Sequence, residues 1–241
     1  RESGKSRRMH RMDFRGRWVI VTGASSGLGW EMVKVLARDH GANVIPVARR
    51  LSRLEELKSE LETSCGVVIE PIAADLSDVA EVDRVFREAT TNHPVYAAIL
   101  NAGITHFGAY AELSWESFRT MLDTNVIATV RMSTALIPAL EAQGGGLMIV
   151  SSMAGIHPVP FQTHYSGTKA FLVHFGVGLW NELVGRNVSV TVYAPSGVVS
   201  GPAPEPVMKL RTEPGGNIGK SRPICTSSSS TFSACFVWWR W

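Results

Sequence analysis

Tyr165 and Lys169 form the reactive pair on which the sequence centres. Side chains four positions apart lie one turn apart on the same face if the segment is a helix. A free tyrosine has a pKa of about 10, and a nearby positive charge favours its ionised form. We therefore expect Lys169 to lower the pKa of Tyr165, so that the phenol can act as a general acid–base near neutral pH. Ser152, which follows the apolar run 147–150, could hydrogen-bond the same substrate oxygen.

A tyrosine and a lysine at this spacing also occur on many solvated helices, and the pair gains weight from a glycine-rich segment upstream. The apolar run 17–22 predicts a buried strand, and Gly23, Gly27 and Gly29 follow it before an amphipathic segment. A strand, a glycine-rich turn and a helix form the arrangement that binds dinucleotides. The glycines let the backbone approach phosphate, and the helix N-terminus offers it free N–H groups. The alternative is a tight strand–helix turn without a ligand.

The residue that follows the second predicted strand, 43–48, is Arg49. An acidic residue at this position binds the 2′-hydroxyl of the ribose, whereas an arginine accommodates a 2′-phosphate. Arg49 therefore favours NADP over NAD as the cofactor. Arg49 and Arg50 could instead be solvated residues that begin the next predicted helix, 51–63.

Apolar runs alternate with amphipathic segments along most of the chain, which predicts an α/β fold with a parallel sheet covered on both faces. Strands are expected at 17–22, 43–48, 67–73, 95–100, 147–150 and 188–194. Helices are expected after Gly29 and at 51–63, 79–90, 114–140 and 162–184. Asn125 falls inside the predicted helix 114–140, where a buried asparagine is a poor helix former and needs polar partners. It is either a capping defect or a working residue.

Composition fits one α/β domain with a sizeable core, since 45% of the 241 residues are hydrophobic. Residues 1–17 hold seven basic and two acidic residues, a net charge of +5, so the remainder of the chain carries about −2 of the total of +3. This balance argues against a nucleic-acid-binding surface. The three cysteines have no metal-ligand spacing, so we expect no metal site and a reducing, cytoplasmic location. No run reaches the roughly 18 apolar residues of a membrane span.

The two ends of the chain depart from the alternating pattern. Residues 1–13 are basic and polar and are predicted to form a disordered arm before a domain at 14–200. From 201 onward the periodicity fails, five of the twelve prolines occur, and no seventh strand is recognisable. Residues 201–241 are therefore interpreted as an irregular, aberrant tail, which a frameshifted, truncated or chimeric end explains better than a designed module.

Over about residues 14–200 the chain resembles the classical short-chain dehydrogenase/reductase family. Five motifs agree in order and spacing: the glycine-rich stretch 22–29, the sequence Asn101-Ala102-Gly103, and then Asn125, Ser152, and Tyr165 with Lys169. The resemblance implies a hydride-transfer enzyme on a Rossmann-like, doubly wound parallel sheet. The six strands would follow the order 3-2-1-4-5-6, with a seventh strand missing.

The resemblance also implies a role for each catalytic residue. Ser152 would hold the carbonyl oxygen of the substrate, and Tyr165 would protonate it during reduction or deprotonate the alcohol during oxidation. Lys169 would hydrogen-bond the nicotinamide ribose and lower the pKa of the tyrosine. Asn125 would hold a water that links Lys169 to solvent.

By the same resemblance, a larger set of residues would contact the cofactor. This set comprises Gly23, Ser25, Ser26 and Leu28 around the pyrophosphate, Arg49 at the 2′-phosphate, Asp75 and Leu76 at adenine, Asn101, Ala102 and Gly103 at the adenosine ribose, then Tyr165, Lys169, Val198 and Ser200. Two departures from the family pattern weaken this assignment of cofactor contacts. Ser26 stands where NADP-preferring members often carry a basic residue, and the family's Pro-Gly after strand six is Pro195-Ser196 here.

The segments 104–107 and 154–164 are mostly apolar and would line the substrate site, which favours a small apolar ketone or secondary alcohol. Helices 114–140 and 162–184 would pair two copies into a homodimer. The alternative is a catalytically impaired NADP-binding protein, because the region that should cover the substrate has no recognisable counterpart. A nucleotide-sugar epimerase would space its glycines differently, and a methyltransferase has no use for the tyrosine–lysine pair.

Overall fold

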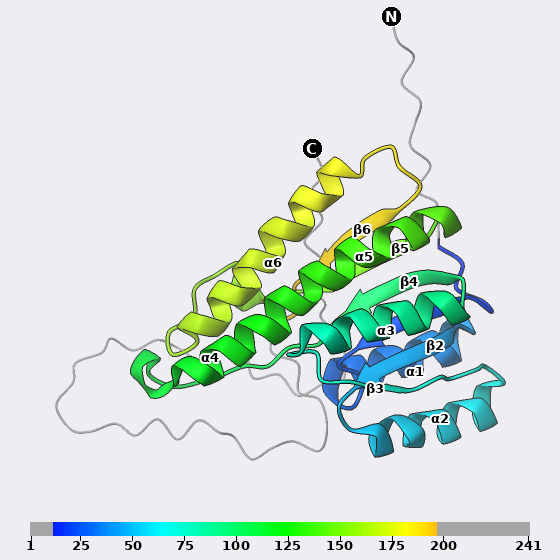
Figure 1. Ribbon diagram of the computed structural model, residues 1–241, viewed down its shortest axis with the longest axis horizontal. Coiled ribbons are helices and arrows are strands. Elements are labelled where there is room, and N and C mark those ends of the chain that lie inside the picture. Colours follow the sequence, from blue (N-terminus) through cyan, green and yellow to red (C-terminus); the bar gives the residue numbers. More distant parts are fainter. Residues whose placement is uncertain (1–11, 197–241) are drawn as a thin grey trace, which may run out of the picture.

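The computed structural model describes residues 12–196, which fold around one six-stranded parallel sheet (Figure 1). The strand order is β3-β2-β1-β4-β5-β6, and every neighbouring pair is parallel. Both the α/β class and the strand order predicted from the sequence are therefore confirmed. Most of the predicted arm, the tail 201–241, Val198 and Ser200 lie outside the described residues.

The strands and helices alternate along the chain as the hydrophobic pattern predicts. The strands are β1 Trp18–Thr22, β2 Asn43–Ala48, β3 Ile72–Ala73, β4 Val95–Leu100, β5 Gly146–Val150 and β6 Ser189–Tyr193. The α-helices are α1 Gly27–His40, α2 Leu51–Cys65, α3 Val79–Asn92, α4 Trp115–Leu122, α5 Ala128–Gln143 and α6 Thr163–Glu182. Short 3₁₀ turns occur at Tyr110–Glu112 (η1) and Met153–Gly155 (η3), and Asp123–Ile127 forms a π-helix (η2).

The sheet separates two apolar cores, because successive strand side chains point to opposite faces. Ile20 of β1 packs in the core under α3, α5 and α6, whereas its neighbours Val19 and Val21 pack in the core under α1 and α2. In Figure 1, α3, α5 and α6 accordingly lie on one side of the sheet and α1 on the other. All six residues of β4 are buried, as expected for a central strand covered on both faces.

Two predicted elements differ from the structure. The strand predicted at 67–73 is reduced to β3 and an isolated bridge from Val44 to Ile69. Pro46 of β2 lies between Val44 and Val47, the β2 partners of these two pairings, and proline cannot donate the ladder hydrogen bond that would join them. The helix predicted over 114–140 is divided by the π-helix that contains Asn125.

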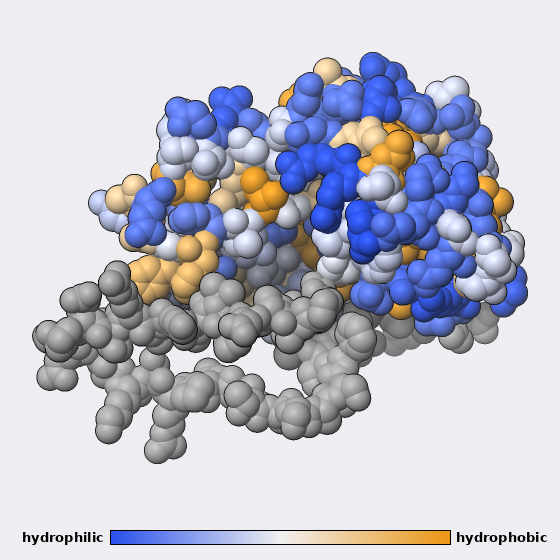
Figure 2. Space-filling view, turned by 90° about the horizontal axis from the view of Figure 1, so that it is seen from below, coloured by the Kyte–Doolittle hydropathy of each residue, from blue (hydrophilic) through white to orange (hydrophobic). Residues whose placement is uncertain are grey.

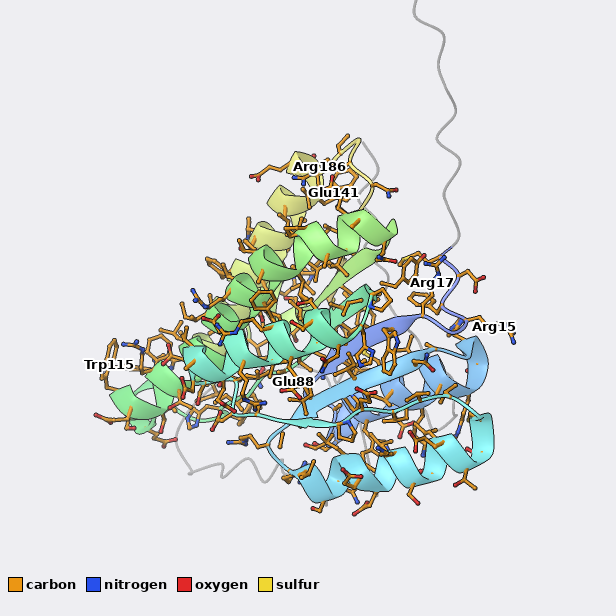
Figure 3. All side chains as sticks on the ribbon, turned by 45° about the vertical axis from the view of Figure 1, so that its right-hand side comes forward. Arg15, Arg17, Glu88, Trp115, Glu141 and Arg186 are labelled. Carbon is orange, nitrogen blue, oxygen red and sulfur yellow. The ribbon has the colours of Figure 1, made fainter. Side chains whose placement is uncertain are left out.

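Ion pairs between helices stabilise the arrangement on the α5 side of the sheet. The Nε of Arg186, in the turn after α6, donates to Oε1 of Glu141 in α5 at 2.7 Å. Figure 3 shows this pair at one end of the helical layer, with Trp115 of α4 at the other. Among residues 12–196, none of the helices combines the length and apolarity that crossing a bilayer requires.

Candidate active site

A cavity of about 530 Å³ opens where β1, β4 and β5 end, at the point where the strand order reverses. Leu28, from the glycine-rich segment, lines it together with Ser152, Tyr165 and Lys169. The remaining lining residues come from the segments after β4, β5 and β6: Asn101, Gly103, Ile104, Thr105, Val150, Ser151, Met153, Ala154, Val159, Gln162, Pro195 and Ser196. Figure 2 shows a hollow between a large hydrophilic mass and a smaller one that carries hydrophobic patches.

The glycine-rich turn is packed so closely that side chains do not fit at two positions. A Cβ on Gly29 would lie 2.4 Å from the carbonyl oxygen of Gly23. Gly23 has a φ of +69°, and a Cβ there would lie 2.9 Å from the Cα of Ala102. Both contacts are with backbone, which cannot move aside without opening the turn. This is the close packing between strand, turn and helix that dinucleotide-binding glycines provide.

Thr22 ties the glycine-rich turn to the end of β4. Its hydroxyl oxygen accepts the backbone N–H groups of Asn101 at 2.9 Å and Ala102 at 3.0 Å. The side-chain amide of Asn101 donates in return to the carbonyl of Thr22 at 3.0 Å. The asparagine predicted to contact the cofactor ribose therefore also holds the turn in register with β4.

The start of α1 leaves polar groups available beside the turn. Ser26 is the N-cap residue, but its side chain makes no capping hydrogen bond. The first N–H groups of an α-helix have no partner inside the helix and are a site for phosphate. Ser25 is buried, and its hydroxyl accepts a hydrogen bond from the Nη2 of Arg50 at 3.1 Å.

Arg50 is a residue that the sequence reasoning missed. Its guanidinium also donates to the carbonyl of Ser25 at 3.2 Å, which places it on the glycine-rich turn. Arg49, the predicted 2′-phosphate ligand, is exposed, and its charge contributes to lowering the pKa of Asp75. Arg50 therefore contacts the glycine-rich turn from the carboxyl end of β2, whereas Arg49 acts on Asp75. The only signal for Arg50 was its position next to Arg49.

Asp75 and Leu76 lie outside the cavity lining. The backbone N–H of Ser77, its hydroxyl and Arg49 together lower the pKa of the Asp75 carboxyl, although burial opposes them. Leu76 is 7% exposed and packs into the core under α3 and α5. Their predicted contact with adenine stays a prediction.

Lys169 is almost completely buried, with 3% of its surface exposed. Its ammonium group donates to the carbonyl of Val150 at 2.9 Å. Burial lowers the pKa of Lys169 to about 8, so the side chain still carries its charge at neutral pH. The sequence could not predict this burial, because the four-residue spacing of Tyr165 and Lys169 does not indicate how deeply either side chain is buried.

Tyr165 does not show the acidic shift that we expected. Burial raises the pKa of its phenol, and a hydrogen bond with Ser152 opposes that shift without overcoming it. The Nζ of Lys169 lies 5.8 Å from the centroid of the tyrosine ring and donates to Val150 instead. The expectation that Lys169 lowers the pKa of Tyr165 is therefore wrong for this structure, and the phenol is protonated at neutral pH.

The two serines after β5 have different surroundings. Ser151 is buried, and its hydroxyl donates to the backbone carbonyl of Lys169 at 2.7 Å. Ser152 lines the cavity beside Tyr165, and its hydroxyl accepts the N–H of Ala154 at 3.1 Å. A Cβ on Gly155 would lie 2.5 Å from the backbone of Lys169, so this glycine allows the serine loop to pack against α6.

Asn125 is fully buried in the π-helix and is a connector, so the capping-defect interpretation is wrong. Its side-chain oxygen accepts the N–H of Ile104 at 2.8 Å, and its amide nitrogen donates to the Ile104 carbonyl at 2.9 Å and to the Thr168 hydroxyl at 3.0 Å. Thr168 in turn donates to the carbonyl of Tyr165 at 2.8 Å. The asparagine thus joins the loop after β4 to the helix that carries Tyr165 and Lys169. π-Helical turns of this kind occur frequently at functional sites.

Thr168 is the second residue that the sequence reasoning missed. It lies between the tyrosine and the lysine and is 2% exposed, but nothing in a single sequence distinguishes it from a surface threonine. Within residues 12–196, His, Cys, Asp and Glu side chains form no group that could hold a metal ion.

The fold is that of the dinucleotide-binding α/β proteins, and the chain belongs to the short-chain dehydrogenase family. The family model described as short chain dehydrogenase matches residues 17–206, which confirms the resemblance found in the motifs.

Curated relatives and solved structures agree with this family. The chain is 34% identical over 185 residues to the very-long-chain 3-oxoacyl-CoA reductase of Kluyveromyces lactis, an alignment that covers 73% of this chain and 53% of the reductase. It is 35% identical over 186 residues to an uncharacterized oxidoreductase of Myxococcus xanthus, covering 76% and 73%. A short-chain dehydrogenase from Sphingobium yanoikuyae in complex with NADPH superposes with a TM-score of 0.73 at 29% identity, covering 76% of this chain and 72% of that one. The chain spans about half the length of the yeast reductase.

Proposed function

We propose that this protein is an NADP-dependent oxidoreductase that interconverts an apolar carbonyl compound and a secondary alcohol. One observation carries the proposal: a single cavity is lined both by Leu28 of the glycine-rich segment and by Ser152, Tyr165 and Lys169. A cofactor bound on the turn and a substrate held by these side chains would share that space. The solved relative that binds NADPH supports the choice of cofactor.

The residues around the turn fit a dinucleotide, because Gly23 and Gly29 leave no room for a Cβ and the start of α1 offers N–H groups. Gly23, Ser25, Ser26 and Leu28 would hold the pyrophosphate. The bound cofactor supplies the hydride. The other proposed contacts are Asp75, Leu76, Asn101, Ala102 and Gly103 at the adenosine, Lys169 and Tyr165 at the nicotinamide ribose, and Val198 and Ser200 beyond the described residues.

The 2′-phosphate would bind Arg49 and Arg50, which directly follow β2 and of which Arg50 contacts the glycine-rich turn. A guanidinium forms paired, charge-assisted hydrogen bonds with phosphate oxygens. An NAD-binding site would have an acidic residue in place of Arg49. The arginine pair therefore favours NADP.

Side chains of the protein would supply the proton that the substrate oxygen takes up during reduction. Because burial raises the pKa of Tyr165, its phenol is protonated at neutral pH and can donate to a substrate carbonyl oxygen. Ser152, which hydrogen-bonds the phenol, would donate to the same oxygen. The Lys169 ammonium, anchored on Val150, would orient the ribose. Asn125, which positions the loop after β4 against α6, would hold a water that links Lys169 to solvent. This protonation state suits carbonyl reduction.

We further propose a cytoplasmic homodimer that pairs through α5 and α6. Apolar side chains are exposed at both helices, namely Ile127 just before α5 and Phe171 and Trp180 on α6. Phe171 stacks on Phe175 with ring centroids 5.9 Å apart. Exposed apolar surface of this kind marks contacts with partners.

The function is tested by mixing the protein with NADPH and a panel of apolar ketones while cofactor oxidation is followed. We expect oxidation that depends on both protein and ketone, and slower oxidation with NADH. NADPH binding detected by fluorescence without any turnover would favour the catalytically impaired NADP-binding protein. Absence of binding by either cofactor would contradict the proposal.

A further inference from the structure

Two loops that border the cavity are joined outside it. The loop after β4 contains Phe107, and the loop after β5 contains Phe161. The backbone N–H of Gly108 donates to the carbonyl of Phe161 at 2.9 Å. The rings of Phe107 and Phe161 lie with their centroids 6.1 Å apart and their planes at 42°. We call this pair of rings the aromatic lip.

The backbone at the lip is held in an unusual conformation. Phe161 has a φ of +65°, the only positive φ of a non-glycine residue within 12–196. The left-handed region is unfavourable for a bulky side chain, and such strain gathers at ligand-binding sites. A Cβ on Gly108 would lie 2.5 Å from the carboxylate of Glu112 and 2.9 Å from the imidazole of His106, so this glycine lets the loop after β4 fold tightly on itself. The fold therefore maintains the contact at a cost in backbone strain.

The two rings are exposed and lie next to residues that line the cavity. Phe107 is 62% exposed and Phe161 is 55% exposed. Their sequence neighbours Thr105, Val159 and Gln162 line the cavity itself. Exposed aromatic side chains at the border of a cavity can bind the apolar part of a ligand that extends out of it. The hydrophobic patches beside the hollow in Figure 2 agree with such binding.

We propose that the aromatic lip determines specificity, by covering an aryl or bulky alkyl group of a ketone whose carbonyl lies at Tyr165. The inference rests on the proposed function, and it adds the substrate class: ketones with a bulky apolar substituent some bonds away from the reacting carbon. The remote group gains contact with both rings, so its binding assists the reaction at a distance. A ketone with only small substituents does not reach the lip.

The test compares butan-2-one with 4-phenylbutan-2-one, which have the same methyl ketone and differ by a phenyl group. The variants are Phe107→Ala and Phe161→Gly, the latter because glycine adopts a positive φ without strain. Tyr110→Ala is the matched control, since this aromatic residue is 74% exposed in the loop after β4 and makes no ring contact among the described residues. We expect the ratio of kcat/KM for the phenyl ketone over butan-2-one to fall about tenfold in both lip variants and to be unchanged in Tyr110→Ala.

A second measurement separates this inference from the proposed reaction. Equilibrium dialysis of 4-phenylbutan-2-one against the NADP-loaded proteins should show binding about tenfold weaker in both lip variants, even if no ketone is turned over. Equal binding and equal kcat/KM ratios in all variants would overturn the proposed role of the lip in specificity. The lip would also be refuted if Phe107→Ala changed only the sedimentation of the protein, because the rings would then form a contact between copies.

Discussion

The two halves of the site are built in opposite ways. The half that ends β1 is made by backbone, where Gly29 and Gly23 approach so closely that a Cβ would lie 2.4 Å from a carbonyl oxygen. The half that faces β5 and α6 is made by buried polar side chains, of which Asn125 and Lys169 are almost completely enclosed. The first half has no room for an added atom, whereas the second cannot lose a hydrogen-bonding atom. The two halves should therefore fail in different ways.

The largest effect on cofactor binding is expected from adding one methyl group to the backbone-built half. Gly29→Ala forces the turn away from Gly23, and overpacking of this kind costs about 3 kcal/mol, or roughly a hundredfold in the Kd for NADPH. Fluorescence titration with NADPH measures it. Gly178→Ala is the control, because nothing lies within 4 Å of its added Cβ. NADPH affinity unchanged in Gly29→Ala would show that the close approach has no functional meaning.

Removing hydrogen bonds from the side-chain-built half should lower stability instead. Asn125→Ala leaves the N–H and the carbonyl of Ile104 without their partner and removes a donor to the Thr168 hydroxyl, and orphaned buried groups cost about 2–3 kcal/mol. Urea unfolding would record this loss in the free energy of unfolding. Affinity for NADPH should change less than in Gly29→Ala. If the variant were as stable as wild type, the asparagine would not be the connector described here.

A smaller effect is expected from the pH dependence of Lys169. The pKa of Lys169 falls from 10.5 to about 8 on folding, so between these values the unfolded chain binds more protons than the folded protein. The contribution of Lys169 to stability therefore rises as pH increases through this window, by about 2 kcal/mol between about pH 7.5 and pH 9.5. Urea unfolding of wild type and Lys169→Met at the two pH values isolates this contribution of Lys169 to the free energy of unfolding. A difference between the two proteins that does not change with pH would mean that the ammonium is not buried in solution.

The fold could be predicted well because the periodicities of strands and helices depend on neighbouring residues alone. The glycine-rich turn also marks the passage from a strand to a helix. Prediction failed where distant residues decide the outcome. Pro46 shortens β3 because it removes a ladder donor from the neighbouring strand β2, and the π-helix at Asn125 depends on partners in another loop and another helix. Arg50 acquires its place from Ser25, which lies 25 residues earlier.

The raised pKa of Tyr165 was outside the reach of sequence reasoning for a related reason. Burial is set by the packing of the whole site, and here its effect on the phenol exceeds that of the hydrogen bond with Ser152. The spacing of Tyr165 and Lys169 predicts a shared helix face, but not that Lys169 points its ammonium at Val150. The four-residue spacing therefore predicts where the two side chains lie better than it predicts the pKa of Tyr165.

The most direct test of this account is the Tyr165→Phe variant, which keeps the ring and removes only the hydroxyl. NADPH affinity should stay within about twofold of wild type, because the turn is untouched. Reduction of a ketone that wild type accepts should fall by about a thousandfold, since positioned general acids contribute factors of this order. Ketone reduction at a rate within a few fold of wild type, measured with saturating NADPH, would contradict the assignment of Tyr165 as the proton donor.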